Sequence, residues 1–406
     1  MNQNICLFKR IFVCTLMLFM SIAHIFAYET IDSTLAKRME QVDVSLLTCQ
    51  PRDEIYALYG HTAIRVQDKE RNQDFVVNYG VFDFRARFFI IRFVFGITDY
   101  MMGICSYEDF RREWNTGIYE QRINMTASEK ARFLELLAIN NEPQNLVYRY
   151  NYFYDNCATR ARNILFDSFE AEVEYKPLTS WQQGNKSFRW LIHSRNTEHP
   201  WARLGNDILL GVGADANTSH SDRQFLPDVM CADFDSAIVV YPDGSKKPLI
   251  ATSGWISKPA DKSLTSGNSP PFIPTPTHCA AFILCAILAL CIIERFVTHK
   301  PLRAIRLAIL ALYGLPGIIL FLMFFSQHPT VSLNLQILAL NPLWLILAIP
   351  TRKMKYRWHI VAASLLLFFI GNVVQDYAEG VNILALGLFL LALNCIIPVK
   401  STFSAQ

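Results

Sequence analysis

The sequence predicts an α+β domain outside the cytoplasm, followed by an α-helical membrane domain of about five spans. Three observations predict this organisation: the N-terminus resembles an export signal, the middle of the chain carries short runs of alternating apolar and polar residues, and the last third is dominated by long apolar runs. The composition, with 52% hydrophobic and 18% charged residues, also points to a membrane protein. The net charge of +3 gives no sign of nucleic-acid binding, and we expect none.

The first 27 residues have the pattern of a secretory signal. Lys9 and Arg10 precede an apolar run from Ile11 to Met20, and small residues lie near Ala27. No cysteine follows an apolar lipobox at this point, so we do not expect the protein itself to be a lipoprotein. If the segment is not cleaved, it forms one more membrane anchor.

The region after the signal is expected to contain short strands and one well-marked helix. Thr126, with Glu129 three residues later, forms the capping box that opens a helix over 126–139. We expect strands at Val44–Leu47, Thr62–Val66, Phe75–Tyr79, Phe88–Phe95 and Leu146–Tyr154, and a hairpin of Asp235–Tyr241 and Lys247–Ala251 around Asp243-Gly244.

The apolar runs near the C-terminus are each close to the ~20 residues that a helix needs to cross a bilayer. Basic residues fall on alternate loops, whereas loops 326–332 and 376–380 contain no lysine or arginine. By the positive-inside rule the basic loops are cytoplasmic, which places the region before the first span outside the cytoplasm. The expected spans are about 279–296, 304–325, 333–350, 358–375 and 381–398, of which the third is the shortest.

Four consecutive regions follow from these patterns. Residues 257–277 contain five prolines and many serines and threonines, which is typical of a linker. We therefore expect a signal peptide at 1–27, a soluble domain at 28–256, this linker, and a membrane domain at 278–400. The signal and the topology together predict a multi-pass membrane protein with its soluble domain outside the cytoplasm.

Cys157 is the first candidate for chemistry because of its place in the expected local structure. An aromatic, extended run ends at Asp155 and Asn156, which are good N-cap residues, and apolar residues then follow at helical spacing. Cys157 therefore lies in the first turn of a helix, where the helix dipole favours a thiolate. A buried, purely structural cysteine is the alternative interpretation.

His61 is the expected partner of Cys157. It follows Gly60 at a turn and begins an alternating strand, Thr62–Val66. A histidine at a strand start and a cysteine at a helix start are the two parts of a cysteine-nucleophile site. Each residue alone fits a structural role equally well, so the prediction rests on the two together.

The order of these two residues carries a resemblance. His61 precedes Cys157, whereas papain-like proteases run from cysteine to histidine. The order here resembles that of the circularly permuted papain-like group, whose lecithin:retinol acyltransferase-like branch has a strand histidine followed by an Asn-Cys helix start. The resemblance implies a permuted papain-like (NlpC/P60-like) fold and acyl transfer through a cysteine thioester.

A nucleophile–base pair needs a third group to orient the imidazole. Asn78, on the next expected strand, is our first choice and Asp83 our second, with an ordinary strand-end turn as the alternative. The side chain of Asn156 and the backbone N–H of Cys157 are candidate oxyanion donors. Arg160, one turn into the helix, is a candidate for binding a lipid phosphate, and an ion-paired surface arginine is the alternative.

The loop between the second and third spans carries His328 and Pro329 at the outer membrane edge. Polar residues at membrane depth are costly and often functional. We expect this loop, which faces the same side as the soluble domain, to shape a lipid entry or to dock a lipoprotein. A capped interfacial turn is the alternative.

Several other kinds of site find no support in the sequence. No CxxC motif and no His/Cys cluster indicates zinc, and GxGxxG, P-loop and GxSxG motifs are absent. We therefore expect neither a metal nor a cofactor. Cys49, Cys105 and Cys231 lie in a compartment that permits disulfides. With Cys157 free, these three cannot all pair within the chain, and the sequence does not specify their state.

The combined motifs resemble a known family over nearly all of the mature chain. They are Leu47–Cys49, Gly60–Val66, Asn78–Phe84 and Tyr154–Arg160 in the soluble region, and His328-Pro329 to Asn341-Pro342 in the membrane region. This set is similar to the Lnb-type lipoprotein N-acyltransferase family. The resemblance implies that Cys157, assisted by His61, takes an acyl chain from a membrane phospholipid. The thioester then passes it to the α-amine of the N-terminal cysteine of a diacylated lipoprotein.

Two other functions remain open from the sequence. The same Cys–His pair fits a membrane-tethered hydrolase, either a phospholipase or a peptidase of cell-wall peptides. The second is a non-catalytic membrane protein whose permuted fold binds lipid or a partner chain. The sequence does not determine the preferred acyl chain, the position of donor cleavage or the oligomeric state.

Overall fold

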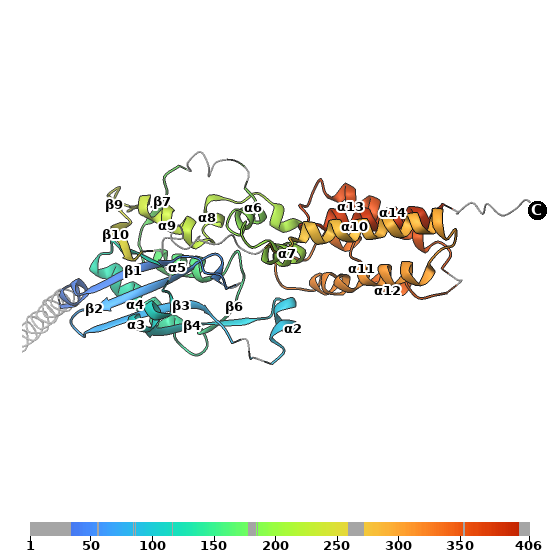
Figure 1. Ribbon diagram of the computed structural model, residues 1–406. Coiled ribbons are helices and arrows are strands. Elements are labelled where there is room, and N and C mark those ends of the chain that lie inside the picture. The colour runs from blue at the N-terminus through green and yellow to red at the C-terminus, as the bar shows by residue number, and fades with distance from the viewer. Residues whose placement is uncertain are drawn as a thin grey trace, which may run out of the picture.

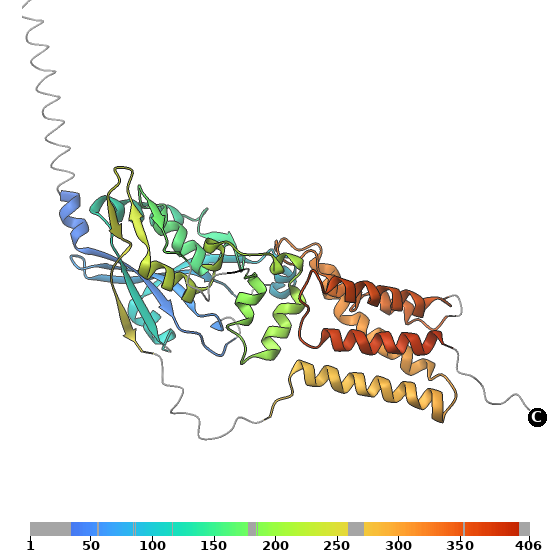
Figure 2. The same cartoon turned by 90° about the horizontal axis from the view of Figure 1, so that it is seen from above.

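The computed structural model describes residues 34–54, 57–83, 85, 87–115, 117–177, 184, 186–258, 272–351 and 354–397. The expected signal peptide lies outside these residues, and so does most of the expected linker. The chain is elongated, with a mixed α/β part at one end, a bundle of helices at the other, and short helices between them (Figures 1 and 2). We call these parts the sheet domain (42–177 with 238–257), the helical bundle (276–397) and the connecting helices (188–236).

One antiparallel sheet of seven strands organises the sheet domain. Its strand order is β10-β5-β1-β2-β3-β4-β6, so that β1 to β4 are neighbours both in sequence and in space. The strands expected at 44–47, 62–66 and 75–79 are confirmed. The seven strands are β1 Val42–Cys49, β2 His61–Asp68, β3 Gln73–Val81, β4 Asp99–Ser106, β5 Ile118–Ile123, β6 Val147–Arg149 and β10 Ile250–Ser257.

A second, three-stranded sheet lies beside the first. It consists of β7 (Glu172–Glu174), β8 (Ile238–Val240) and β9 (Lys246–Pro248). The pairing of β8 with β9 confirms the hairpin expected around Asp243-Gly244. The strand expected over 146–154 forms only the three residues of β6, because Asn151 to Asp155 make a turn closed by an isolated bridge.

Helices cover both faces of the large sheet. α5 (Cys157–Phe166) packs against β2 and β3, where Ala161 and Ile64 share one hydrophobic core. α4 (Ala127–Asn140) packs against α5 and begins with the expected capping box. On the other face, α3 (Tyr107–Glu113) packs against β3 and β4. Because side chains alternate along a strand, neighbouring residues of β2 belong to different cores.

The segment Phe88–Phe95 is not the strand that we expected. Its residues form a short helix, α2 (Phe89–Val94). Arg92 is the only polar residue in this run, so no alternation marks it as a strand, and its type is decided by its surroundings rather than by its sequence pattern. Here the segment lies at the end of the helical bundle that is nearer the sheet domain, where it packs against α11.

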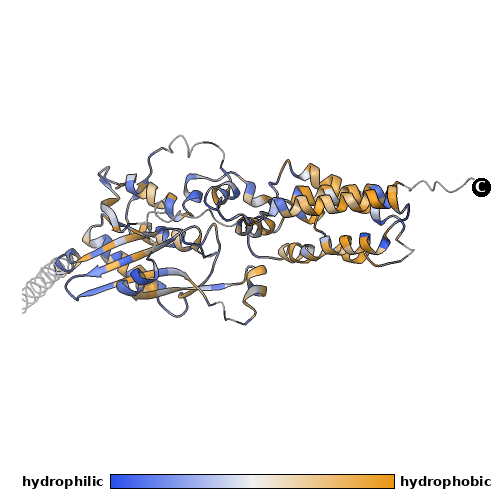
Figure 3. Ribbon diagram, in the orientation of Figure 1, coloured by the Kyte–Doolittle hydropathy of each residue, from blue (hydrophilic) through white to orange (hydrophobic). Residues whose placement is uncertain are grey.

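The helical bundle carries the hydrophobic surface expected of a membrane domain (Figure 3). Among the described residues, Pro276–Val297 and Arg303–Met323 are the two helices long and apolar enough to cross a membrane, while three other apolar helices are shorter. α14 packs against both α10 and α13, and α11 packs against α12. The helices are α10 Pro276–Ile292, α11 Arg303–Met323, α12 Leu343–Leu347, α13 Arg357–Gly371 and α14 Val381–Ile396.

The third expected span, 333–350, is not one continuous helix. It divides into the 3₁₀ turn η5 (Leu335–Leu338) and α12, separated by Asn341 and Pro342. Proline lacks the N–H that would continue a helix across this point. Polar side chains of this broken segment are buried: Asn334 and Gln336 lie in the junction between the bundle and the connecting helices.

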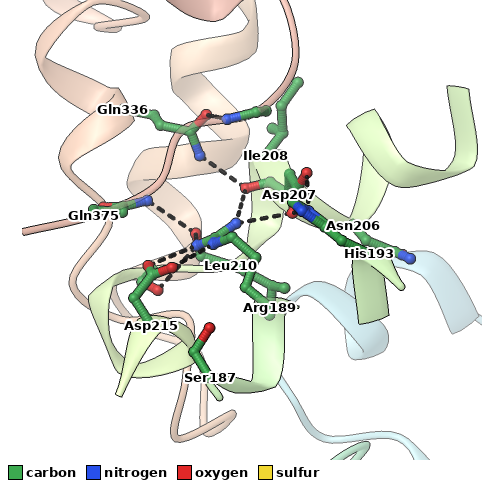
Figure 4. Close-up of polar contacts among 12 residues, drawn as sticks. Ser187, Arg189, His193, Asn206, Asp207, Ile208, Leu210, Asp215, Gln336 and Gln375 are labelled. Atoms are coloured by element: carbon green, nitrogen blue, oxygen red, sulfur yellow. Dashed lines mark hydrogen bonds and ion pairs between the residues drawn. The ribbon is translucent and has the colours of Figure 1, made fainter. Parts of the chain in front are cut away.

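The connecting helices attach to the bundle through a buried polar network (Figure 4). Gln336 donates to the backbone oxygen of Asp207 at 2.8 Å, Asn334 donates to that of Ile208 at 2.7 Å, and Gln375 donates to that of Leu210 at 3.1 Å. The connecting helices themselves are α6 Phe188–His193, α7 Pro200–Leu209, η2 Val212–Asp215, α8 His220–Arg223 and α9 Pro227–Ser236.

Arg189 lies at the centre of this network. Its guanidinium is fully buried and pairs with Asp207 at 2.9 Å and Asp215 at 2.8 Å. It also donates to the backbone oxygens of Leu210 and Gly211. A buried charge is tolerated only when it is paired and hydrogen-bonded, and here every direction of the guanidinium is occupied. The network therefore fixes the connecting helices against the end of the bundle that lies nearer the sheet domain.

Candidate active site

A tight turn places His61 at the start of β2. Gly60 has φ +76°, and a Cβ built on it would lie 2.5 Å from the backbone oxygen of Cys49. Only glycine adopts this backbone conformation without strain and leaves room for that oxygen. His61, the next residue, then lies opposite Cys49 in the register of β1 and β2.

The helix α5 places Cys157 at its first position, as expected. Asn156 is the N-cap: its side-chain oxygen accepts from the backbone N–H groups of Ala158 and Thr159, both at 3.0 Å. The Thr159 hydroxyl accepts from the Asn156 backbone N–H at 2.8 Å and completes a capping box. This reciprocal cap fixes the backbone around Cys157, so the thiol is held at the positive end of the helix.

Cys157 and His61 lie within interaction distance. Burial alone would raise the pKa of the Cys157 thiol, but the charge and the hydrogen bond of His61, with the backbone N–H groups of Thr62 and Ala158, bring this pKa below its usual value. Burial alone would lower the pKa of His61, but Cys157 and Asn78 raise it. The two shifts have opposite signs, as expected for a thiolate–imidazolium pair.

Asn78 on β3 is the residue that holds the imidazole. His61 Nε2 and Asn78 Oδ1 lie 3.0 Å apart. The amide N–H of Asn78 in turn points at Cys105, with Nδ2 3.6 Å from Sγ, so the amide oxygen is the atom that faces the ring. Nε2 therefore carries a proton, and Nδ1 is the nitrogen left to exchange a proton with Cys157.

Trp114 packs on the imidazole, a contact that the sequence did not reveal. The ring of His61 stacks on that of Trp114 with centroids 5.0 Å apart and an interplanar angle of 7°. The Arg52 guanidinium lies 4.3 Å from the Trp114 ring centroid, and it donates to the backbone oxygen of Glu113 at 2.8 Å. In the sequence, Trp114 is simply a tryptophan that follows residues 107–113, and nothing there indicates that its ring packs on His61.

Three tyrosines, Tyr59, Tyr150 and Tyr152, lie near the site, and sequence reasoning also missed them. Tyr59 accepts from Asn196 and Asn206 at 2.9 Å each, and its ring meets that of Tyr152 edge to face at 5.7 Å. Burial raises the pKa of Tyr150 and of Tyr152, and the neighbouring Cys157 raises both further. These hydroxyls therefore remain protonated beside the thiolate.

The other site candidates from the sequence lie in different surroundings. Both N–H groups of the Asn156 amide are donated to backbone oxygens, those of Tyr152 and Phe225. Its geometry is that of a cap, and an oxyanion contact would require one of these bonds to break. Arg160 makes a bidentate pair with Asp155 at 2.6 and 2.7 Å, which is the alternative that we named for it.

Asp83 and His328 lie outside the group around Cys157. Asp83 is exposed, and its carboxylate accepts from the backbone N–H of Arg85 at 2.8 Å, as in a turn. His328 is 3.2 Å from the backbone oxygen of Phe93, so it joins the loop after α11 to α2. The structure thus brings together His61, Asn78 and Cys157, but not these two.

The remaining thiols of the sheet domain and connecting helices differ from Cys157. Burial raises the pKa of Cys49, Cys105 and Cys231, in the last case to about 12. None of the described cysteines forms a disulfide. Among these four, Cys157 is the one whose pKa is lowered, which favours its thiolate form. Within the described ranges, no group of three or more His, Cys, Asp or Glu residues has the arrangement of a metal site.

Two family models match this chain. The model of the Lnb N-terminal periplasmic domain matches residues 31–187, which include His61, Asn78 and Cys157. The model of the Lnb transmembrane domain matches residues 268–402, which include the whole helical bundle. The connecting helices lie between the two matched regions. Neither a curated protein nor a solved structure matches the chain.

Proposed function

We propose that this chain, which belongs to the Lnb family, is a lipoprotein N-acyltransferase that works through a thioester on Cys157. Membership of this family gives the chain a periplasmic N-terminal domain and a transmembrane domain. The family is associated with the N-acylation of lipoproteins. One observation carries the proposed mechanism: a thiol of lowered pKa lies at a helix start beside a histidine, and Asn78 fixes that ring. We place the protein in the bacterial inner membrane with its soluble domain in the periplasm, because its alternating basic loops put that domain outside the cytoplasm and the matching family domain is periplasmic.

In the first half-reaction, the Cys157 thiolate attacks the carbonyl carbon of a phospholipid ester. The carbonyl oxygen takes up the negative charge, and the backbone N–H of Cys157, at the helix N-terminus, is the donor that we assign to it. The C–O bond to the glycerol then breaks, and the imidazolium of His61 gives its proton to the leaving alkoxide. A lysophospholipid leaves, the acyl group stays on sulfur, and His61 is neutral.

In the second half-reaction, the α-amine of the acceptor's N-terminal cysteine attacks the thioester carbonyl. His61, now neutral, takes a proton from the amine, and the C–S bond breaks to regenerate the thiolate. The products are an amide on the lipoprotein and the original thiolate–imidazolium pair. The overall change converts a phospholipid and a diacylated lipoprotein into a lysophospholipid and a triacylated lipoprotein.

The junction with the bundle supports acyl transfer between two membrane-anchored substrates. Tyr59, two residues before His61, accepts from Asn206, and the adjacent Asp207 accepts from Gln336 of the bundle. The site is therefore linked to the bundle through α7, which hydrogen-bonds to Tyr59 at Asn206 and to Gln336 at Asp207. Donor and acceptor confined to one bilayer have a high effective concentration near such a site, and water competes less well.

The other candidate residues receive supporting roles in this proposal. Asn78 orients His61, and Asn156 holds the backbone at the start of α5. Arg160 is proposed to fix the same turn through Asp155 rather than to bind a phosphate. Asp83 is assigned no part in the chemistry. His328 is proposed to hold α2 against the bundle, on the side from which lipid substrates arrive.

A time course of the acyl-enzyme tests the proposal against hydrolysis. The purified full chain is loaded from phospholipid, and intact-protein mass spectrometry follows the acyl group on Cys157. We expect a diacylated lipopeptide with a free α-amine to discharge the thioester far faster than water does. Acetylation of that amine should leave the thioester long-lived. Equal discharge by both lipopeptides, with release of free fatty acid, would favour a membrane-tethered phospholipase instead.

A further inference from the structure

α2 presents large apolar side chains to its surroundings. Phe88 is 59% exposed, Ile91 54% and Phe93 37%. They form one hydrophobic element, which stands out on the hydropathy view between the sheet domain and the bundle (Figure 3). Apolar residues concentrated on so short a segment are unusual on a surface that faces only water, and they indicate a binding or membrane surface.

The position of α2 identifies what covers these side chains. The backbone N–H of Gln327, in the loop after α11, donates to the oxygen of Phe95 at 2.9 Å, and His328 lies against Phe93. Gly96, with φ +66°, fits closely against Gln327 and His328, because a Cβ there would lie 2.8 Å from the His328 nitrogen. α2 is therefore attached to the loop that follows α11, and α11 is long and apolar enough to cross a membrane.

The charges around α2 match the head-group region of a bilayer. Arg85 and Arg87 immediately precede the helix and are exposed, and Arg87 lies over the ring of Phe88. Arg92 pairs with Asp99 at the start of β4. Apolar and aromatic side chains flanked by arginines are characteristic of segments that lie in a membrane interface, where the cations face lipid phosphates.

An aromatic row runs from α2 back into the sheet domain. Phe89 stacks on Phe82 at 5.9 Å, Phe82 meets Tyr100 at 4.9 Å, and Tyr100 stacks on Tyr150 at 4.2 Å. Tyr150 is one of the tyrosines near Cys157, and both residues pack against the core of the sheet domain. The row of ring contacts therefore leads from the exposed helix to Tyr150, which packs against the same hydrophobic core as Cys157.

We propose that α2 is seated in the outer leaflet of the bilayer, and that phospholipid acyl chains approach Cys157 along its aromatic row. The first part, the contact with lipid, does not depend on the proposed acyltransferase activity. The second part rests on that activity, because it assigns the contact to the acyl donor. Neither part involves the amine acceptor.

Photocrosslinking in vesicles tests the contact. The full chain carrying p-benzoylphenylalanine at position 88 or 91 is reconstituted into phosphatidylethanolamine–phosphatidylglycerol vesicles and irradiated. We expect phospholipid adducts on peptides of α2, detected by mass spectrometry. Position 255 is the control, because Trp255 is similarly exposed on β10, away from the bundle. Adducts to a second protein chain, or a lipid yield no higher than at position 255, would overturn the proposal.

A charged substitution tests the route. Ile91→Glu should slow thioester formation from vesicle phospholipid at least ~10-fold, while a short, water-soluble acyl thioester should load Cys157 at the wild-type rate. An unchanged rate from vesicles, or an equal loss with both donors, would overturn the route. If the wild-type chain forms no thioester with either donor, the proposed function fails instead, and the crosslinking result still reports on the contact.

Discussion

The imidazole of His61 and the indole of Trp114 lie nearly parallel, 7° apart, with centroids separated by 5.0 Å. Asn78 fixes the same imidazole within its plane through Nε2. The two contacts are complementary, because a hydrogen bond in the ring plane does not prevent the ring from tilting out of that plane. Together they restrict the orientation of the His61 ring, and because Asn78 occupies Nε2, Nδ1 is the nitrogen left to exchange a proton with Cys157.

Trp114→Leu should therefore weaken catalysis beyond what the loss of a buried side chain in the core explains. We expect acyl-enzyme formation to slow roughly 10-fold or more, since small misplacements of a catalytic group are costly. An aromatic contact of this kind contributes only about 0.5–1.5 kcal/mol beyond its buried area. Trp114→Phe, which retains a stacking ring, is the matched control and should recover most of the rate. Stopped-flow loading and thermal unfolding measure the two effects, and a large loss of stability with normal loading would contradict this assignment.

Cys157→Ala should abolish triacylation of lipoproteins while the protein still accumulates in the membrane. His61→Ala should give nearly the same loss, because the two residues act as one unit. Cys231→Ala is the control, since burial raises the pKa of that thiol to about 12 and leaves it unreactive. Mass spectrometry of lipoprotein N-termini from cells that depend on this chain gives the readout. Full triacylation by the Cys157→Ala chain at normal abundance would end the proposed mechanism.

The local signals in the sequence were sufficient for the pair itself. Asn156 before Cys157 is a capping signal, and Gly60 before His61 is a turn signal, and both elements form as expected. Asn78 could be chosen because it lies on the strand next to His61. These features depend on only a few neighbouring residues or on the pairing of consecutive strands, and such features can be predicted from one sequence.

Features that depend on distant contacts could not be predicted in the same way. Phe88–Phe95 forms a helix because it docks on the loop after α11, more than two hundred residues later. Trp114 and Tyr59 reach the site through packing that leaves no periodic pattern. The Arg189 network likewise joins four separate segments, around Arg189, Asp207, Gln336 and Gln375, and no local pattern indicates that they meet. The third expected span broke at Asn341-Pro342, a signal that was present in the sequence but outweighed by overall hydropathy.

The rate of acylation should follow a bell-shaped dependence on pH. The active pair is a thiolate with a protonated imidazole, so the rate rises as pH increases through the lowered pKa of Cys157. It falls again as pH increases through the raised pKa of His61. The two limbs belong to the coupled pair rather than to either residue alone. Measuring loading rates with a soluble acyl donor gives this profile, and a rate that only rises toward alkaline pH would contradict the ion pair.

Substitutions of Asn78 should move the alkaline limb in opposite directions. The hydrogen bond from Asn78 raises the pKa of His61, so Asn78→Ala should shift this limb to lower pH and reduce the maximum rate. Asn78→Asp places a negative charge beside the ring and should shift the limb to higher pH. Both variants are compared with wild type in the same loading assay. A common shift in the same direction would show that Asn78 does not act through His61.

Gly60→Ala should remove activity through the backbone. The φ of +76° is unfavourable for alanine, at a cost of about 1–3 kcal/mol. The new Cβ would also lie 2.5 Å from the oxygen of Cys49, so the turn must move and His61 must move with it. Gly254→Ala on β10 is the matched control, because no atom lies within 4 Å of its added Cβ. We expect a lower unfolding temperature and strongly reduced loading of Cys157 for Gly60→Ala, and little change in either for Gly254→Ala. Normal loading by Gly60→Ala would mean that the turn does not set the position of His61.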